Sequence, residues 1–255
     1  MATADSVKAK IQGLIDSSNE TTGQNDTDLT SAVNHLKEGY GQGGGGDNYY
    51  DTFWDAYQNN GKRKNYQLAF SGSGWNSITF KPKYDMFINY AFEMFRGCGE
   101  IDVKNCGVSI DFAECTSFSN FAHSSGITRF GVIDTRKVTN LSYAFYSCSK
   151  LISIEKLILK GDGSQSIGGS TTFAECYNLT DITIEGTIGS ATNFKDCKNL
   201  SKASIESIIN ALSTTTSGLT VTLSRAAVDA VTAIYGIQWW GELYDSRPNW
   251  TITLV

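Results

Sequence analysis

The sequence predicts an α+β fold in which a leucine-rich-repeat solenoid lies between an N-terminal helical hairpin and a small C-terminal α/β cap. Three observations predict it. A Phe-x-x-Cys-x-x-Leu motif recurs through the middle of the chain, a glycine-rich stretch separates a helical pattern at the start, and strand and helix patterns alternate after the last motif. The motif recurs every ~20–30 residues, which is typical of solenoids that bury each unit against the next.

The repeat is clearest in the units that begin at Phe145, Phe173 and Phe194, and degenerate units begin at Phe95 and Phe121. Equivalent positions of stacked units fill one column of a shared core, so the motif is interpreted as a packing rule and not as a reaction centre. The expected structural core comprises Phe95, Cys98, Phe121, Phe145, Cys148, Leu151, Phe173, Cys176, Leu179, Phe194, Cys197 and Leu200.

The expected domain organisation has five parts. Apolar residues at helical spacing predict a helical hairpin over residues 1–40, and glycines predict a flexible tether over residues 41–47. An N-terminal cap of the solenoid is expected over residues 48–94, the leucine-rich-repeat coils over residues 95–200, and the C-terminal α/β cap over residues 201–255.

Both caps have internal patterns. Tyr50, Phe53, Trp54 and Tyr57 share one helical face, which indicates either a helix covering the first coil or, less favoured, an aromatic ligand site. Residues 66–85 read as strand, turn and strand. The C-terminal cap reads as a helix over 204–213, a strand over 219–223, a helix between Ser224 and Gly236, and a strand over 250–255.

Composition and motifs favour a binding protein over an enzyme. The net charge is −5 and no basic stripe is present, so no nucleic-acid partner is expected. No apolar stretch approaches the ~20 residues of a membrane span, and no membrane insertion is expected. The cysteines lack Cys-x-x-Cys spacing, and neither His35 nor His123 lies in a triad pattern. We therefore expect no catalytic residue, no cofactor and no metal.

Three segments carry a family resemblance. The coils, with TRKVTNLSYAFYSCSKL at residues 135–151, resemble the BspA-like class of bacterial leucine-rich-repeat proteins. The tail, with LTVTLSRAAVDAV and RPNWTITLV, is similar to the ends of repeat proteins encoded in prophages of gut Firmicutes. The start, with KAKIQGLIDSSNETTGQNDTDL, resembles the N-terminal segment of phage tail-associated proteins.

The resemblance implies a non-enzymatic, phage tail-associated recognition protein for host attachment. It would bind a host cell-surface protein or glycan, contact other tail or virion proteins through the N-terminal hairpin, and reside in the virion. The start lacks the apolar core of a secretory signal, which favours the virion over the bacterial cell surface. Three alternatives stay open: a bacterial cell-surface adhesin of the BspA-like class, a polysaccharide depolymerase using a carboxylate pair, and a purely structural tail component.

The expected partner-binding surface follows from the repeat. If the motif residues face the core, the residues eight and ten positions after each Phe face outward along a strand. The candidate partner-binding residues are these outward positions and two tyrosines in the adjacent turns: Arg129, Ser153, Glu155, Asp181, Thr183, Lys202, Tyr146 and Tyr177. The alternative is a plain solvated sheet face, because exposed polar residues need no ligand.

Overall fold

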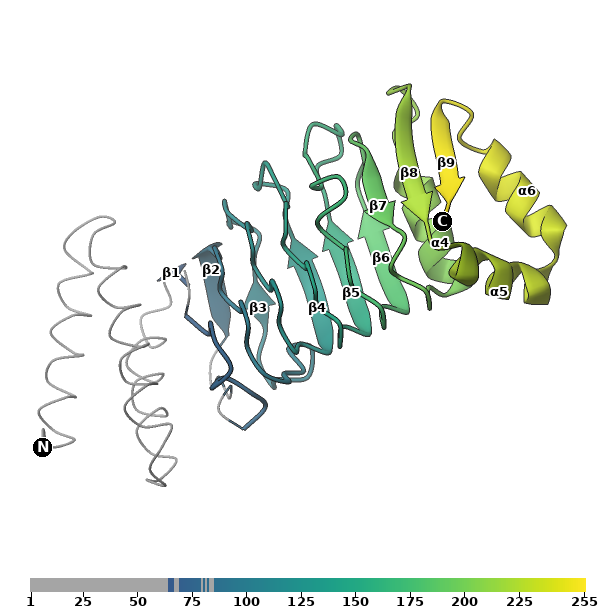
Figure 1. Ribbon diagram of the computed structural model, residues 1–255. Helices are drawn as coiled ribbons and strands as arrows, with labels where there is room; N and C mark the ends of the chain where they lie inside the picture. The colour runs from purple at the N-terminus through teal and green to yellow at the C-terminus, as the bar shows by residue number, and fades with distance from the viewer. Residues whose placement is uncertain (1–63, 67–68, 79, 81, 83–84) are drawn as a thin grey trace, which may run out of the picture.

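The computed structural model describes residues 64–66, 69–78, 80, 82 and 85–255 (Figure 1). The expected hairpin of residues 1–40, the tether of 41–47 and the aromatic helix around Tyr50 lie outside these residues. The described elements are, in chain order, β1 (Lys64–Asn65), β2 (Met86–Tyr90), β3 (Ile110–Asp111), β4 (Arg129–Asp134), β5 (Ser153–Ile158), β6 (Asp181–Glu185), β7 (Thr192–Phe194), α4 (Lys202–Ala211), β8 (Leu219–Leu223), α5 (Arg225–Tyr235), α6 (Ile237–Asp245) and β9 (Trp250–Leu254).

The predicted fold class, a leucine-rich-repeat solenoid with a helical hairpin and a small cap, is wrong. The described residues form a mixed α/β fold of three separate parallel sheets, β1-β2-β3, β4-β5-β6 and β7-β8-β9, and three helices. Strand pairing is therefore not continuous along the chain. After Leu200, where the repeat predicts one more strand beside β6, the chain forms α4.

Helix α4 ends the central sheet by covering the free edge of β6. The Ser204 hydroxyl accepts a hydrogen bond from Ile182 N at 2.9 Å and donates to Thr180 O at 2.9 Å. The Ser207 hydroxyl accepts from Ile184 N at 2.7 Å. The serine side chains thus hydrogen-bond to backbone groups that would otherwise pair with another strand. In this way the backbone groups at the buried edge of the sheet keep hydrogen-bond partners.

The central sheet aligns equivalent positions of consecutive motif units. Arg129 pairs with Ser153, and Ser153 pairs with Asp181, in parallel register. Side chains alternate between the two faces of a strand, so the neighbouring column of Phe130, Ile154 and Ile182 is buried. The three strands lie side by side in Figure 1, joined by turns that run along their edges.

The core is continuous behind these sheets and is rich in phenylalanine. The ring of Phe173 stacks between Phe145, at a centroid distance of 5.4 Å, and Phe194, at 4.7 Å. Phe121 meets Phe145 edge-on at 6.0 Å. Every residue of the core expected from the motif is buried. This row of rings therefore links successive units of the sequence through apolar contact.

The cysteine of the motif has a polar role as well as a packing role. The Cys176 thiol donates to Phe145 O at 3.1 Å, and the Cys197 thiol donates to Phe173 O at 3.7 Å. Each thiol thus reaches the backbone of the preceding unit at its phenylalanine. A small side chain with a weak donor suits this buried position, which explains why Phe and Cys recur together.

Burial should protect these thiols from reagents. Burial raises the pKa of Cys148 to about 11 and the pKa of Cys115 to about 12. Only Cys106 is half-buried; the other five cysteines are buried. We expect a maleimide reagent to modify Cys106 first and the rest only as the native structure opens, while denaturant exposes all six. Mass spectrometry of partly labelled protein measures this order, and early labelling of Cys148 or Cys176 would contradict it.

The C-terminal elements agree with their local signals, with one addition. The helix predicted over 204–213 is confirmed as α4, and strand β8, helix α5 beginning after Ser224, and strand β9 are confirmed as well. Helix α6 was not predicted, because Gly236 read as the end of the segment; it begins directly after that glycine. The predicted strand–turn–strand over 66–85 is not found in its described residues, which form turns, bends and irregular backbone, and residues 67–68, 79, 81 and 83–84 lie outside the description.

Candidate recognition surface

The predicted outward column lies partly where the sequence placed it. Arg129, Ser153 and Asp181 form one row across the central sheet, and the side chains of Glu155 and Thr183 are exposed farther along β5 and β6. The column does not extend to Lys202. That residue begins α4, where its ammonium pairs with Glu206 and lies 5.6 Å from the Trp239 ring centroid.

Two charged residues of this sheet face, Arg129 and Glu155, are already paired. Arg129 Nη1 lies 3.0 Å from Asp102 Oδ2, and Lys104 Nζ lies 2.9 Å from Glu155 Oε2. Each pair joins side chains from different segments. Exposed pairs of this kind contribute ~0–1 kcal/mol each to stability. A ligand would have to compete with these contacts, so the sheet face is a poor first candidate.

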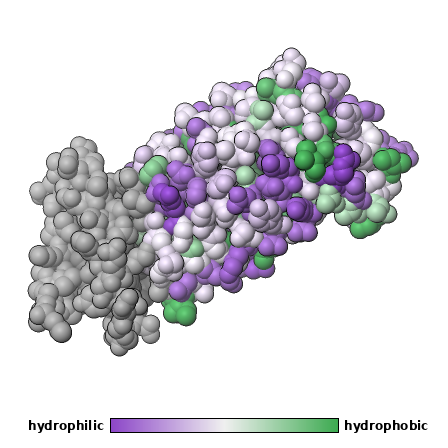
Figure 2. Space-filling view, viewed as in Figure 1, coloured by the Kyte–Doolittle hydropathy of each residue, from purple (hydrophilic) through white to green (hydrophobic). Residues whose placement is uncertain are grey.

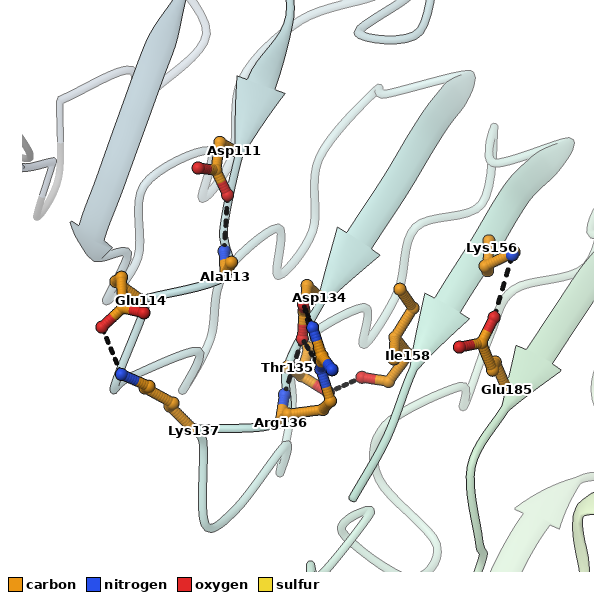
Figure 3. A network of polar contacts seen from close by, with 10 residues as sticks. All are labelled: Asp111, Ala113, Glu114, Asp134, Thr135, Arg136, Lys137, Lys156, Ile158 and Glu185. Atoms are coloured by element: carbon orange, nitrogen blue, oxygen red, sulfur yellow. Dashed lines mark hydrogen bonds and ion pairs between the residues drawn. The ribbon is translucent and has the colours of Figure 1, made fainter. Parts of the chain in front are cut away.

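The same pairing continues toward the end of the strands (Figure 3). Lys156 Nζ lies 2.9 Å from Glu185 Oε2, and Lys137 pairs with Glu114. Burial works against the charge on Asp134, but hydrogen bonds from Arg136 outweigh it and lower the pKa of that carboxyl. The contacts in Figure 3 thus join neighbouring segments, and the charged groups in them are paired with other groups of the protein.

A second surface lies on the turns that lead into the central strands. We call His123, Tyr143, Tyr146, Glu175 and Tyr177 the aromatic edge. The His123 and Tyr146 rings stack with centroids 5.0 Å apart, and Tyr143 lies 5.5 Å from Tyr146. Tyr143 is 42% exposed and Tyr177 is 43% exposed. Large rings with this exposure on a folded surface offer apolar area together with a polar tip.

Glu175 anchors the aromatic edge. Its carboxylate accepts hydrogen bonds from the Tyr146 hydroxyl at 3.1 Å and from the Ser147 hydroxyl at 2.9 Å. The bond to Glu175 raises the pKa of the Tyr146 phenol. Partial burial and the negative charges of Glu175 and Asp196 raise the pKa of Tyr177. Both phenols therefore stay neutral donors across the physiological pH range.

The backbone of this edge is held in an unusual conformation. Ser124, Tyr143, Ser147 and Glu175 have φ between 55° and 61°, a region that side chains other than glycine seldom adopt. Bonds between segments stabilise it: Ser124 N donates to Tyr146 O at 2.8 Å, and Ser147 N donates to Ala174 O at 2.9 Å. Strained backbone over-determined by its surroundings is a feature of preorganised sites.

A surface groove adjoins the aromatic edge. It has a volume of ≈ 380 Å³ and lies where the turns meet the starts of the central strands. Asn178 follows Tyr177 directly and Asn199 donates to Tyr177 O, so the groove lies next to the backbone of that tyrosine. Most of the side chains along it are polar; the groove is lined by Thr128, Lys150, Ile152, Asn178, Thr180 and Asn199.

Two asparagines of the groove are fixed by the same kind of bond. Asn178 Nδ2 donates to Ser149 O at 2.7 Å, and Asn199 Nδ2 donates to Tyr177 O at 2.9 Å. A carboxamide has two N–H donors and an acceptor oxygen, so one bond orients the group and leaves further hydrogen-bonding capacity toward the groove. Both amides are exposed.

Sequence reasoning found only part of this surface. Tyr146 and Tyr177 were predicted as neighbours of the sheet face, whereas His123, Tyr143 and Glu175 were missed. The signal for the groove was present, since Asn precedes the motif leucine in the last two units. The aromatic edge left no local signal, because its members come from three separate turns.

Surface hydropathy, the placement of potential metal ligands and helix length limit which other kinds of site the described residues can form. Figure 2 shows hydrophilic residues over much of the visible surface, with hydrophobic groups toward the α5 and α6 end, where Ile234 and Ile237 are 76% and 73% exposed. Across the described ranges, no group of three or more potential metal ligands gathers. No helix in that part of the chain is long and apolar enough to cross a membrane.

Comparison with known proteins adds no relative. No family model, curated protein or solved structure matches the chain.

Proposed function

We propose that the chain is a non-enzymatic recognition protein of a phage tail, which attaches the virion to a partner on the host cell surface. The observation that carries the proposal is the aromatic edge, in which exposed tyrosines stand beside a fixed carboxylate on a hydrogen-bonded backbone. Aromatic side chains that lose little freedom on contact are favoured at recognition sites. The resemblance of the two ends of the chain to phage and prophage proteins supports a place in a phage tail.

The chemistry of the reactive side chains favours binding over catalysis. Burial raises the pKa of Cys176 well above its usual value, which keeps that thiol from acting as a nucleophile at neutral pH. His123 Nδ1 lies 2.9 Å from Ser124 Oγ. In serine hydrolases the imidazole meets the serine through Nε2 while an acid holds Nδ1. Here the imidazole instead packs its face on Tyr146.

Removing both exposed tyrosines should weaken attachment. We expect Tyr143→Ala with Tyr177→Ala to reduce binding of the fluorescently labelled full chain to host bacteria by about tenfold or more, because both exposed rings of the aromatic edge are lost. Flow cytometry over a panel of gut Firmicutes measures the binding. Surface substitutions usually leave stability within ~0.5 kcal/mol, so the variant should melt like the parent.

The matched variant is Arg129→Ala with Asp181→Ala, which changes the sheet face and leaves the aromatic edge intact. We expect it to bind nearly as well as the parent. If this variant loses attachment while the tyrosine variant keeps it, the recognition surface is the sheet face. If the parent chain attaches to no cell of the panel, the recognition role itself is contradicted.

A further inference from the structure

We propose that the aromatic edge and its groove bind a neutral oligosaccharide, with one sugar ring stacked on Tyr177 and its neighbours bound along Asn178 and Asn199. This inference rests on the proposed recognition function and names its ligand class. It joins two observations: exposed rings at one end of the surface, and a row of oriented amides and hydroxyls at the other.

The rings fit the apolar face of a sugar. A pyranose presents C–H groups on its faces, and the face of an aromatic ring carries partial negative charge that attracts them. Tyr177 is 43% exposed, and Lys198 Nζ lies over its ring, 5.9 Å from the centroid. Tyr143 offers a second exposed ring at the far end of the aromatic edge.

The groove fits the hydroxyls of the next sugars. A hydroxyl both donates and accepts, and the groove supplies partners for both. The amides of Asn178 and Asn199 donate and accept, and the hydroxyls of Thr128 and Thr180, which donate to backbone carbonyls, accept. Because Asn178 and Asn199 are oriented by backbone carbonyls, binding needs little further ordering of their side chains. A few placed polar groups beside apolar area are the usual composition of a ligand site.

The charges favour a neutral ligand over an acidic one. The negative charges of Glu175 and Asp196 act on Tyr177 against the single ammonium of Lys198 over the same ring, so the net charge there would repel a carboxylate or sulfate stacked on that ring. In the groove, the ammonium of Lys150 is held by Glu100 at 3.0 Å. Glu175 accepts two hydrogen bonds, and a carboxylate has about four acceptor sites, so it can still accept from sugar hydroxyls.

A glycan array tests the ligand class. The full chain is applied to neutral hexose and N-acetylhexosamine oligosaccharides and to oligosaccharides that contain uronic or sialic acid. We expect retention on neutral glycans only. By calorimetry with the best neutral glycan, Tyr177→Ala should weaken binding about tenfold or more, whereas Tyr177→Phe, which keeps the ring, should bind within about threefold of the parent. Asn199→Ala should weaken it as well.

The matched control is Tyr244→Ala, which removes a ring of similar exposure, 45%, from α6; it should bind like the parent. The inference is overturned if acidic glycans are preferred or if Tyr177→Ala binds unchanged. It is also overturned if attachment to host cells is abolished by protease and survives periodate, which would identify a protein partner and leave the recognition role intact.

Discussion

Phe173→Ala should destabilise the protein by about 3–5 kcal/mol, as removal of a buried aromatic ring usually does. Phe173 is 1% exposed and stacks between Phe145 and Phe194. Truncation opens a cavity in the row of rings and removes two aromatic contacts at once. Its backbone also accepts the thiol of Cys197, so the surrounding chain is held and cannot easily collapse into the space. Urea denaturation followed by circular dichroism measures the loss.

Phe173→Leu is the matched variant. It keeps most of the apolar volume and loses the ring, so we expect a cost of less than ~1.5 kcal/mol. Tyr177→Ala is the reference for the loss of an exposed ring, and it should change the free energy of unfolding by no more than ~0.5 kcal/mol. A Phe173→Ala variant that unfolds at nearly the parental urea concentration would show that the core does not depend on this row.

Gly186→Ala should have the second largest effect. Gly186 follows β6 with φ at +97°, and a Cβ there would lie 2.4 Å from Leu159 O. The contact is with backbone, and Leu159 N is itself bonded to Glu185 O at 2.8 Å, so the two segments cannot separate without breaking the sheet. Backbone strain at positive φ costs ~1–2 kcal/mol, and a forced overlap in a packed region costs ~1–3 kcal/mol.

Gly107→Ala separates these two costs. Gly107 has φ at +89°, close to that of Gly186, but nothing lies within 4 Å of a Cβ built there. We expect Gly107→Ala to show the conformational strain alone, at ~1–2 kcal/mol. Equal losses for the two alanine variants, measured by urea denaturation, would mean that the close approach of β5 and β6 has no energetic weight.

The local packing could be predicted from the sequence because it repeats. Phe, Cys and Leu recur at fixed spacing, and each recurrence places the same side chain in the same buried column. Helix α5 was equally accessible, since Ser224 precedes it and Gly236, at φ +88°, ends it. These features depend on a few neighbouring residues, so a single sequence is enough to predict them.

The fold class and the candidate surface could not be predicted in the same way. The motif ends at Leu200 and a helix was predicted from residue 204, but its pattern did not show that α4 begins at Lys202 or that its serines replace a strand beside β6. Lys202 was therefore placed on a sheet face that stops before it. The aromatic edge depends on His123, Tyr146 and Glu175 meeting across turns, and contacts between turns have no period in the sequence.

The serines of α4 also protect the protein against aggregation through an exposed strand edge. The outermost strand of a sheet exposes a ladder of backbone groups on which a foreign chain can polymerise, and such strands seed fibrils. Ser204 and Ser207 occupy the amides of Ile182 and Ile184, so β6 offers no free template. Helix α4 therefore acts as a terminator of sheet growth, and it keeps neighbouring copies of the protein from joining edge to edge at this strand.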